Sequence, residues 1–166
     1  MAQQIILNHQ QIQHIIKRIA FQIYETFVEE ETIILAGIKE NGYILATKIK
    51  TELENISELK IILCSIQINK KQPTTPVVAS IDSTLYKNQS IVLIDDVLNT
   101  GSTLIYAVKH LLENEIKKCK TAVLVNRNHK NFPIKADFKG ISLSTSKSEH
   151  VQVAFEASGD SAFLSD

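Results

Sequence analysis

The feature that most constrains the fold is a short apolar strand that ends in two carboxylates and leads into a glycine turn and a helix. Residues 91–104 read Ile-Val-Leu-Ile-Asp-Asp-Val-Leu-Asn-Thr-Gly-Ser-Thr-Leu. The apolar start predicts a strand buried on both faces, which is typical of a parallel sheet covered by helices. The Thr100-Gly101 turn and the apolar spacing beyond it predict a helix over residues 102–112.

Other segments repeat this alternation of strands and helices. Apolar residues recur at helical spacing from Ile12 to Phe27, with Asn8 as the expected N-cap, and again from Tyr43 to Leu53. Further apolar runs predict strands over residues 32–37, 60–68, 77–81, 121–125 and 151–155. We therefore expect an α/β fold with a mostly parallel central sheet and helices on both faces.

Composition narrows the class of protein. The chain of 166 residues suits one domain over residues 1–166, and its 44% of hydrophobic residues is too high for a disordered chain. Its apolar runs fall well short of the roughly 20 residues of a membrane span, and its start does not resemble a secretory signal, so we expect a cytoplasmic protein without a membrane partner. A formal net charge of zero lacks the basic excess that is typical of nucleic-acid binding.

The residues that follow the strand over 91–94 predict a site for a phosphorylated ribose. Ligands of open parallel sheets bind outside the carboxyl ends of the strands. The helix N-terminus after Gly101 offers N–H groups to a phosphate, and Thr100 adds a hydroxyl group. Asp95 and Asp96 can accept hydrogen bonds from vicinal ribose hydroxyls. The alternative is that the two aspartates only cap a turn and that the Thr-Gly pair is an ordinary helix start.

The same stretch resembles the 5-phosphoribosyl 1-diphosphate (PRPP) signature of type I phosphoribosyltransferases. The resemblance implies that fold, with a small hood region that covers the base, and catalysis by Asp95, Asp96 and Lys39. It also implies Mg²⁺ as cofactor, held by Asp95 and Asp96 directly or through water. The residues that it assigns to the ribose and 5′-phosphate are Asp95, Asp96, Val97, Leu98, Asn99, Thr100, Gly101, Ser102 and Thr103.

A second segment, residues 34–42, resembles the diphosphate loop of this family. The residues implied to bind diphosphate are Ile38, Lys39, Glu40, Asn41 and Gly42. Relatives carry a basic residue where this chain has Asn41, and Glu40 adds a negative charge to the loop. The polar loop over residues 69–76 would close over the site and bring Lys70 and Lys71 to the diphosphate, or it would remain a solvated loop.

Residues 122–137 and 144–149 resemble a narrower group, the uracil phosphoribosyltransferases that double as RNA-binding attenuators of the pyrimidine operon. This resemblance implies a hood formed mainly by residues 126–150, and base binding by Asn126, Arg127 and His129. Relatives carry an Asp-Arg pair where this chain has Asn126 and Arg127. The implied reaction transfers phosphoribose from PRPP to a nucleobase, with uracil as the expected base, and releases diphosphate.

Two alternatives to an active enzyme remain open at this point. One is an RNA-binding pyrimidine-operon regulator that senses nucleotides with little catalysis, and the other is a catalytically silent nucleotide-binding protein. The resemblance also implies a homodimer or a higher oligomer. The residues that occupy the regions of the RNA-binding face in relatives are Lys17, Arg18, Lys130, Lys135 and Lys147, and a set of solvated basic side chains is the alternative reading.

Overall fold

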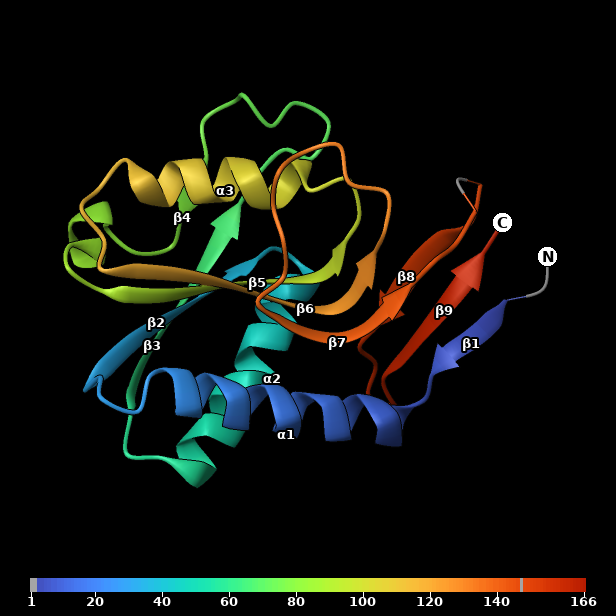
Figure 1. The fold of residues 1–166 in the computed structure, drawn as a ribbon, viewed down its shortest axis with the longest axis horizontal. Coiled ribbons are helices and arrows are strands. Elements are labelled where there is room, and N and C mark those ends of the chain that lie inside the picture. Colours follow the sequence, from blue (N-terminus) through green and yellow to red (C-terminus); the bar gives the residue numbers. More distant parts are fainter. Residues whose placement is uncertain (1–2, 147) are drawn as a thin grey trace.

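A central sheet of six strands organises the molecule, with the strand order β4-β3-β2-β5-β6-β7 (Figure 1). The structure, a computed structural model, describes residues 3–146 and 148–166. The parallel strands are β2 (Thr32–Ile38), β3 (Lys60–Gln67), β5 (Ser90–Leu98), β6 (Lys118–Arg127) and β7 (Phe138–Leu143). Strand β4 (Val78–Ala79) is antiparallel to β3 at the edge. The expected α/β fold with a mostly parallel sheet is confirmed.

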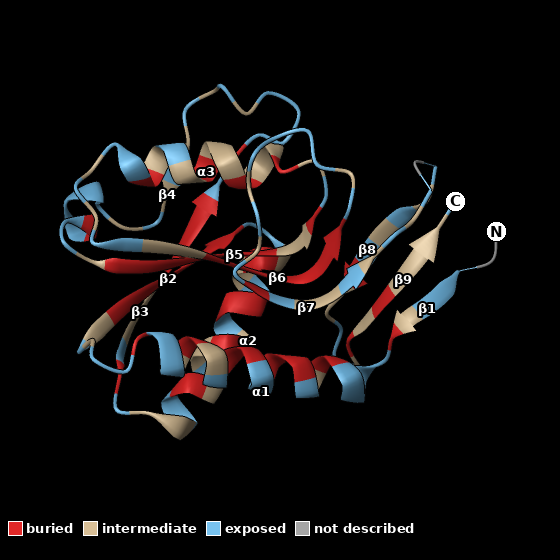
Figure 2. Ribbon diagram, viewed as in Figure 1, coloured by how far each residue is buried: buried red, intermediate tan, exposed pale blue. Residues whose placement is uncertain are grey.

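Helices cover both faces of this sheet. Helices α1 (His9–Thr26) and α2 (Asn41–Ile56) lie on one face, and α3 (Ser102–Leu112) lies on the other (Figure 1). A short 3-10 helix, η1 (Ser83–Tyr86), precedes β5. Because the central strands touch helices on both sides, they are buried along most of their length, as the red segments of Figure 2 show. Two separate hydrophobic clusters result, one on each face of the sheet.

A second, smaller sheet stands beside the β7 edge of the central sheet (Figure 1). It consists of β1 (Gln4–Leu7), β9 (Ser161–Ser165) and β8 (His150–Ala154), all antiparallel to their neighbours. The sequence predicted only the strand that becomes β8. Residues 126–150, expected to form most of the hood, supply the end of β6, the whole of β7 and the loops that connect them to β8. Their role in covering a base stays a prediction.

Several strand and helix boundaries differ from the sequence prediction. Strand β5 continues through the two carboxylates to Leu98, and β6 begins at Lys118, because these two strands pair with each other from Ser90 and Lys118 to Leu98 and Asn126. The loop expected over residues 37–42 shrinks to Lys39-Glu40, because β2 runs to Ile38 and α2 begins at Asn41. Sheet pairing therefore extends polar strand ends that have no apolar pattern of their own.

The structure also describes the helices that bear on membrane insertion and the two cysteines. Within residues 3–146 and 148–166, no helix is long and apolar enough to span a bilayer. Both cysteines, Cys64 and Cys119, carry free thiols. Burial raises the pKa of the Cys64 thiol to about 12 and that of the Cys119 thiol to about 11, so both stay protonated at neutral pH.

The start of α1 provides a stability test. The Asn8 side chain accepts a hydrogen bond from the Gln11 N–H at 2.9 Å, and the Gln11 side chain accepts one from the Asn8 N–H at 2.9 Å. We expect Asn8→Ala to lower the free energy of unfolding by about 1 kcal/mol, because the first turn loses its cap. Urea denaturation measures this change. Asn8→Asp keeps an acceptor and should unfold close to wild type, whereas equal midpoints for Asn8→Ala and wild type would contradict the capping role.

Candidate functional site

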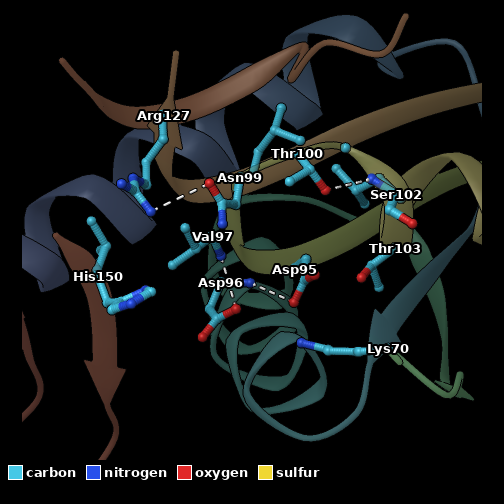
Figure 3. Close-up of a pocket in the computed structure, with 14 residues that line it drawn as sticks. Lys70, Asp95, Asp96, Val97, Asn99, Thr100, Ser102, Thr103, Arg127 and His150 are labelled. Carbon is cyan, nitrogen blue, oxygen red and sulfur yellow. Dashed lines mark hydrogen bonds between the residues drawn. The ribbon is translucent and has the colours of Figure 1, made fainter. Parts of the chain in front are cut away.

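A cavity of about 310 Å³ lies at the carboxyl end of β5 (Figure 3). Its largest contribution is the continuous segment 95–104, which comprises the end of β5, the glycine turn and the start of α3. Lys70 borders it from the loop after β3, Arg127 from the end of β6, and His150 and Val151 from β8. The central sheet and the small sheet therefore both contribute to one cavity. Its volume lies at the lower end of the range of small-molecule sites.

Asp95 and Asp96 place two carboxyl groups side by side in this cavity. Asp95 is only 3% exposed, and Asp96 is half-buried. Burial raises the pKa of Asp95 well above its usual range, the negative charge of Asp96 raises it further, and the Lys70 ammonium opposes the shift. A cation or a set of hydroxyl donors placed here would relieve this unfavourable pairing.

Backbone hydrogen bonds orient both carboxyl groups. The Asp96 N–H donates to Asp95 Oδ1 at 2.9 Å, and the Val97 N–H donates to Asp96 Oδ1 at 2.8 Å. The other oxygen of Asp96 accepts a hydrogen bond from Asn41 Nδ2 at 3.0 Å. The two side chains are thus held in place before any ligand binds, which suits recognition of a fixed pattern of hydroxyls.

The turn between β5 and α3 has backbone N–H groups that could bind an anion. Gly101 has a φ of 88°, a left-handed conformation that favours glycine, and it occupies the N-cap position of α3. Gly101 has no side chain to cap this helix end, and Thr100 Oγ1 accepts a hydrogen bond from the Ser102 N–H at 3.3 Å. The N–H groups of the first turn beyond Ser102 are therefore available to a ligand. The turn is anchored from the other side, because the Asn131 N–H donates to the Thr100 carbonyl at 2.8 Å.

The connection between β2 and α2 approaches the same carboxylates. Lys39 and Glu40 are exposed, the peptide bond between them is cis, and the Lys39 N–H donates to the Ile66 carbonyl at 2.9 Å. Gly42 packs directly against β5, because a Cβ at this position would lie 2.6 Å from the Ile94 carbonyl oxygen. Of the described residues that border the cavity, none comes from 38–42, but Asn41 reaches it through Asp96.

Arg127 is 3% exposed and connects the two ends of the cavity. Its Nη1 donates to Asn99 Oδ1 at 3.3 Å, in the turn after β5 (Figure 3). Its Nη2 donates to Thr145 Oγ1 at 2.7 Å and to the Glu149 carbonyl at 2.7 Å, in the loop before β8. Most of its donors are therefore used by the chain itself. Arg127 holds this loop in place, and the base contact expected of it remains a prediction.

The other two expected base-binding residues lie behind the cavity wall. Asn126 Nδ2 donates to Ser142 Oγ at 3.2 Å, and among the described residues its Oδ1 is the buried side-chain oxygen without a partner. His129 Nε2 lies 2.6 Å from the Thr145 carbonyl, a distance at which it donates. Neither residue borders the cavity: Asn126 contacts β7, and His129 contacts the loop before β8, so the role in base binding stays a prediction for both.

Sequence reasoning missed His150 and Val151. These residues border the cavity because β8 pairs with β9 and β9 pairs with β1. No local motif marks them, since their position depends on pairing between segments at opposite ends of the chain. Lys70, in contrast, borders the cavity. This agrees with the alternative in which the loop over residues 69–76 approaches the site.

Comparison with known proteins gives one consistent family. A family model described as a phosphoribosyl transferase domain matches residues 2–158. A bifunctional protein PyrR of Staphylococcus saprophyticus is 34% identical over 94% of this chain and 94% of its own length. A bifunctional protein PyrR of Haemophilus ducreyi is 32% identical over 93% of this chain and 90% of its own.

Solved structures support the same fold at lower identity. A hypoxanthine phosphoribosyltransferase from Staphylococcus aureus has a TM-score of 0.73 and 17% identity, over 86% of this chain and 79% of that one. A hypoxanthine phosphoribosyltransferase of Trypanosoma cruzi has a TM-score of 0.72 and 16% identity, over 84% of this chain and 81% of that one. At this level of identity the likeness concerns the fold alone.

The buried carboxyl group of Asp95 gives a pH-dependent test. Because its pKa is raised on folding, its contribution to stability is greatest below the usual pKa of aspartate and is lost as the pH rises through the raised value. Asp95→Asn removes this loss. We therefore expect the variant to unfold at higher urea concentration than wild type at pH 7, with a gain that shrinks as the pH falls.

The matched control for this test is Asp82→Asn. The Thr84 N–H lowers the pKa of the exposed Asp82 side chain, so neutralisation there should bring no gain at pH 7. Urea unfolding at several pH values measures both variants. A lower stability of Asp95→Asn than of wild type at pH 7 would show that the Asp95 charge is not unfavourable in the free protein.

Proposed function

The chain belongs to the phosphoribosyltransferase family, and we propose that it transfers the phosphoribosyl group of PRPP to uracil or a related pyrimidine base with release of diphosphate. The observation that carries this proposal is the joint placement of two carboxylates and a helix N-terminus around one cavity. Asp95 and Asp96 would accept hydrogen bonds from the ribose hydroxyls. The N–H groups at the start of α3 would hold the 5′-phosphate.

The reaction displaces diphosphate from the anomeric carbon by a nitrogen of the base. Positive charge develops on the ribose ring, next to the carboxylates of Asp95 and Asp96, and negative charge develops on the leaving diphosphate. On the diphosphate side, Lys70 offers an ammonium group at the cavity and Lys39 offers a second one on the exposed loop after β2. Glu40 is also exposed, so its carboxylate can remain in solvent, away from the diphosphate.

The donor set fits Mg²⁺ as cofactor. Within the described part of the chain, no group of three or more His, Cys, Asp or Glu side chains forms a closed metal site. Mg²⁺ is usually held by one or two carboxylates together with waters and substrate phosphates, which Asp95 and Asp96 with bound PRPP would supply. When bound, Mg²⁺ would neutralise charge on the leaving diphosphate.

The base would lie between the turn after β5 and the loop before β8. Arg127 holds these two segments together through Asn99 and Glu149. Backbone groups of the loop and of His150 would then face the base. The Asn99 amide cannot act as a general base at neutral pH, which favours a pyrimidine over a reaction that requires a carboxylate at this position.

Turnover with PRPP, Mg²⁺ and each nucleobase in turn tests the proposed function. We expect release of diphosphate with uracil and not with purines. The double variant Asp95→Asn, Asp96→Asn should lose this activity, because the ribose hydroxyls lose both charged acceptors, while Asp82→Asn on the surface should keep it. Absence of turnover with every base would overturn the enzymatic proposal, and full activity in the double variant would show that the ribose binds elsewhere.

RNA binding is a second candidate, because the relatives are named as bifunctional proteins. The structure engages part of the basic set in contacts within the chain. The Arg18 guanidinium donates to the Lys139 carbonyl at 3.1 Å and to the Gly140 carbonyl at 2.7 Å, so it is engaged within the chain. Lys17, Lys130 and Lys135 are exposed, and Lys147 lies outside the described residues.

We expect only weak binding of a pyrimidine-operon leader transcript, with an affinity that falls as salt increases, because the net charge of the chain is zero. A gel-shift titration at low and moderate salt measures this. Tight binding that does not change with salt would contradict an interaction through exposed lysines.

A homodimer also stays a prediction, and Phe21, which is 57% exposed on α1, is a side chain that such an interface would bury.

A further inference from the structure

One side chain bridges the central sheet and the small sheet beside the cavity. Asn41 is the first residue of α2. Its Nδ2 donates to Asp96 Oδ2 at 3.0 Å, at the end of β5, and to the Val153 carbonyl oxygen at 2.9 Å, in β8. A side-chain amide has two N–H donors, so both are in use. A single residue thus connects α2, β5 and β8, which lie far apart in the sequence.

We propose that Asn41 is a positioning residue that fixes the ribose-binding carboxylate of Asp96 and the β8 wall of the cavity in one arrangement. The inference rests on the proposed function, because it concerns how PRPP is bound. It assigns a role to the loop position at which the family resemblance would place a basic residue.

Hydrogen bonds to both oxygens fix the Asp96 carboxylate. Its Oδ1 accepts the Val97 N–H and its Oδ2 accepts the Asn41 amide, so one donor on each oxygen fixes the plane of the carboxylate. Each oxygen keeps a further lone pair for a ribose hydroxyl or a cation. Because the amide is neutral, it orients the carboxylate without cancelling its charge, whereas a lysine or arginine here would form an ion pair with it.

Asn41 also holds the cavity wall that β8 forms. His150 and Val151 border the cavity, and Val153 lies on the same face of this strand as Val151. Strand β8 pairs with β9 and, in the described structure, with no strand of the central sheet. The hydrogen bond from Asn41 to the Val153 carbonyl is therefore a direct polar connection between this wall and the carboxylates opposite. Its loss would let the wall move relative to the ribose site.

Two substitutions separate this role from simple packing. Asn41→Ala removes both hydrogen bonds. Asn41→Asp keeps the shape of the side chain but places a carboxylate against the Asp96 carboxylate and the Val153 carbonyl, so both contacts become repulsive. If the Asn41 side chain only filled space, Asn41→Asp would bind PRPP better than Asn41→Ala. The proposed bridge requires the opposite, with weaker PRPP binding in Asn41→Asp.

Calorimetric titration with PRPP and Mg²⁺ measures the effect on binding. We expect the Kd for PRPP to rise about tenfold in Asn41→Ala, the ratio typical of a lost hydrogen bond to a charged group, and to rise further in Asn41→Asp. Asn55→Asp is the matched control, because Asn55 is an exposed residue of the same helix and the change is the same. It should bind PRPP as wild type does.

Steady-state kinetics provide a readout that loss of stability alone would not change. In Asn41→Ala we expect the KM for PRPP to rise more than kcat falls, because saturating ligand can still draw the freed carboxylate and wall into place. A substitution that only reduced the folded fraction would lower the apparent kcat and leave KM unchanged. That second pattern would overturn the proposal.

Hydrogen exchange without ligand tests the bridge independently of PRPP. Backbone amides of β8 should exchange faster in Asn41→Ala than in wild type, and should not change in Asn55→Asp. Failure of the wild-type protein to bind PRPP would overturn the proposed function and the positioning role with it. Wild-type affinity for PRPP in both Asn41 variants, with wild type itself binding, would overturn the positioning role alone.

Discussion

The parallel pairing of β5 with β2 on one side and β6 on the other is the constraint on which the rest of the structure depends. It brings the carboxyl ends of three strands to one edge of the sheet, and charged side chains stand at each of these ends. Strand β2 leads to the exposed Lys39 and Glu40, β5 to the two carboxylates, and β6 to Arg127. Burial of the strand interiors by helices on both faces keeps this alignment fixed, so polar groups gather only where the strands leave the core.

The same constraint explains how charge is distributed in the molecule. A chain with no net charge still concentrates negative charge at one point, because Asp95 and Asp96 are adjacent and Asp95 is buried. The Lys70 ammonium opposes the rise in the Asp95 pKa, and Lys70 comes from a loop rather than from the sheet. The free protein therefore holds an unfavourable arrangement that a substrate with hydroxyls and a bound cation would stabilise. Such stored electrostatic cost is typical of binding sites.

Local patterns in the sequence were sufficient to predict the helices and strands whose conformation depends on residues close in the chain. Helix α1 shows apolar residues at helical spacing and its Asn8 cap, and α3 follows the Thr-Gly turn, so both were predicted within a few residues. The site segment from Asp95 to Thr103 was found in the same way, because strand, carboxylates and turn are consecutive. Strands β1, β7 and β9 were not predicted, since they are short and owe their conformation to partners far away in the chain. The cavity wall at His150 and the internal hydrogen bonds of Arg127 depend on that same distant pairing.

The pairing of β1 with β9 has a consequence for how the site is assembled during folding. Gln4 lies opposite Leu164, so the small sheet joins the two ends of the described chain. Contacts between such distant segments form late, because the entropy of closing a long loop must first be offset by local structure. The central sheet can therefore place Asp95, Asp96 and the turn between β5 and α3 before β8 pairs with β9. Completion of the cavity would then report on closure of the whole chain, and a molecule that binds across it would select the fully folded protein.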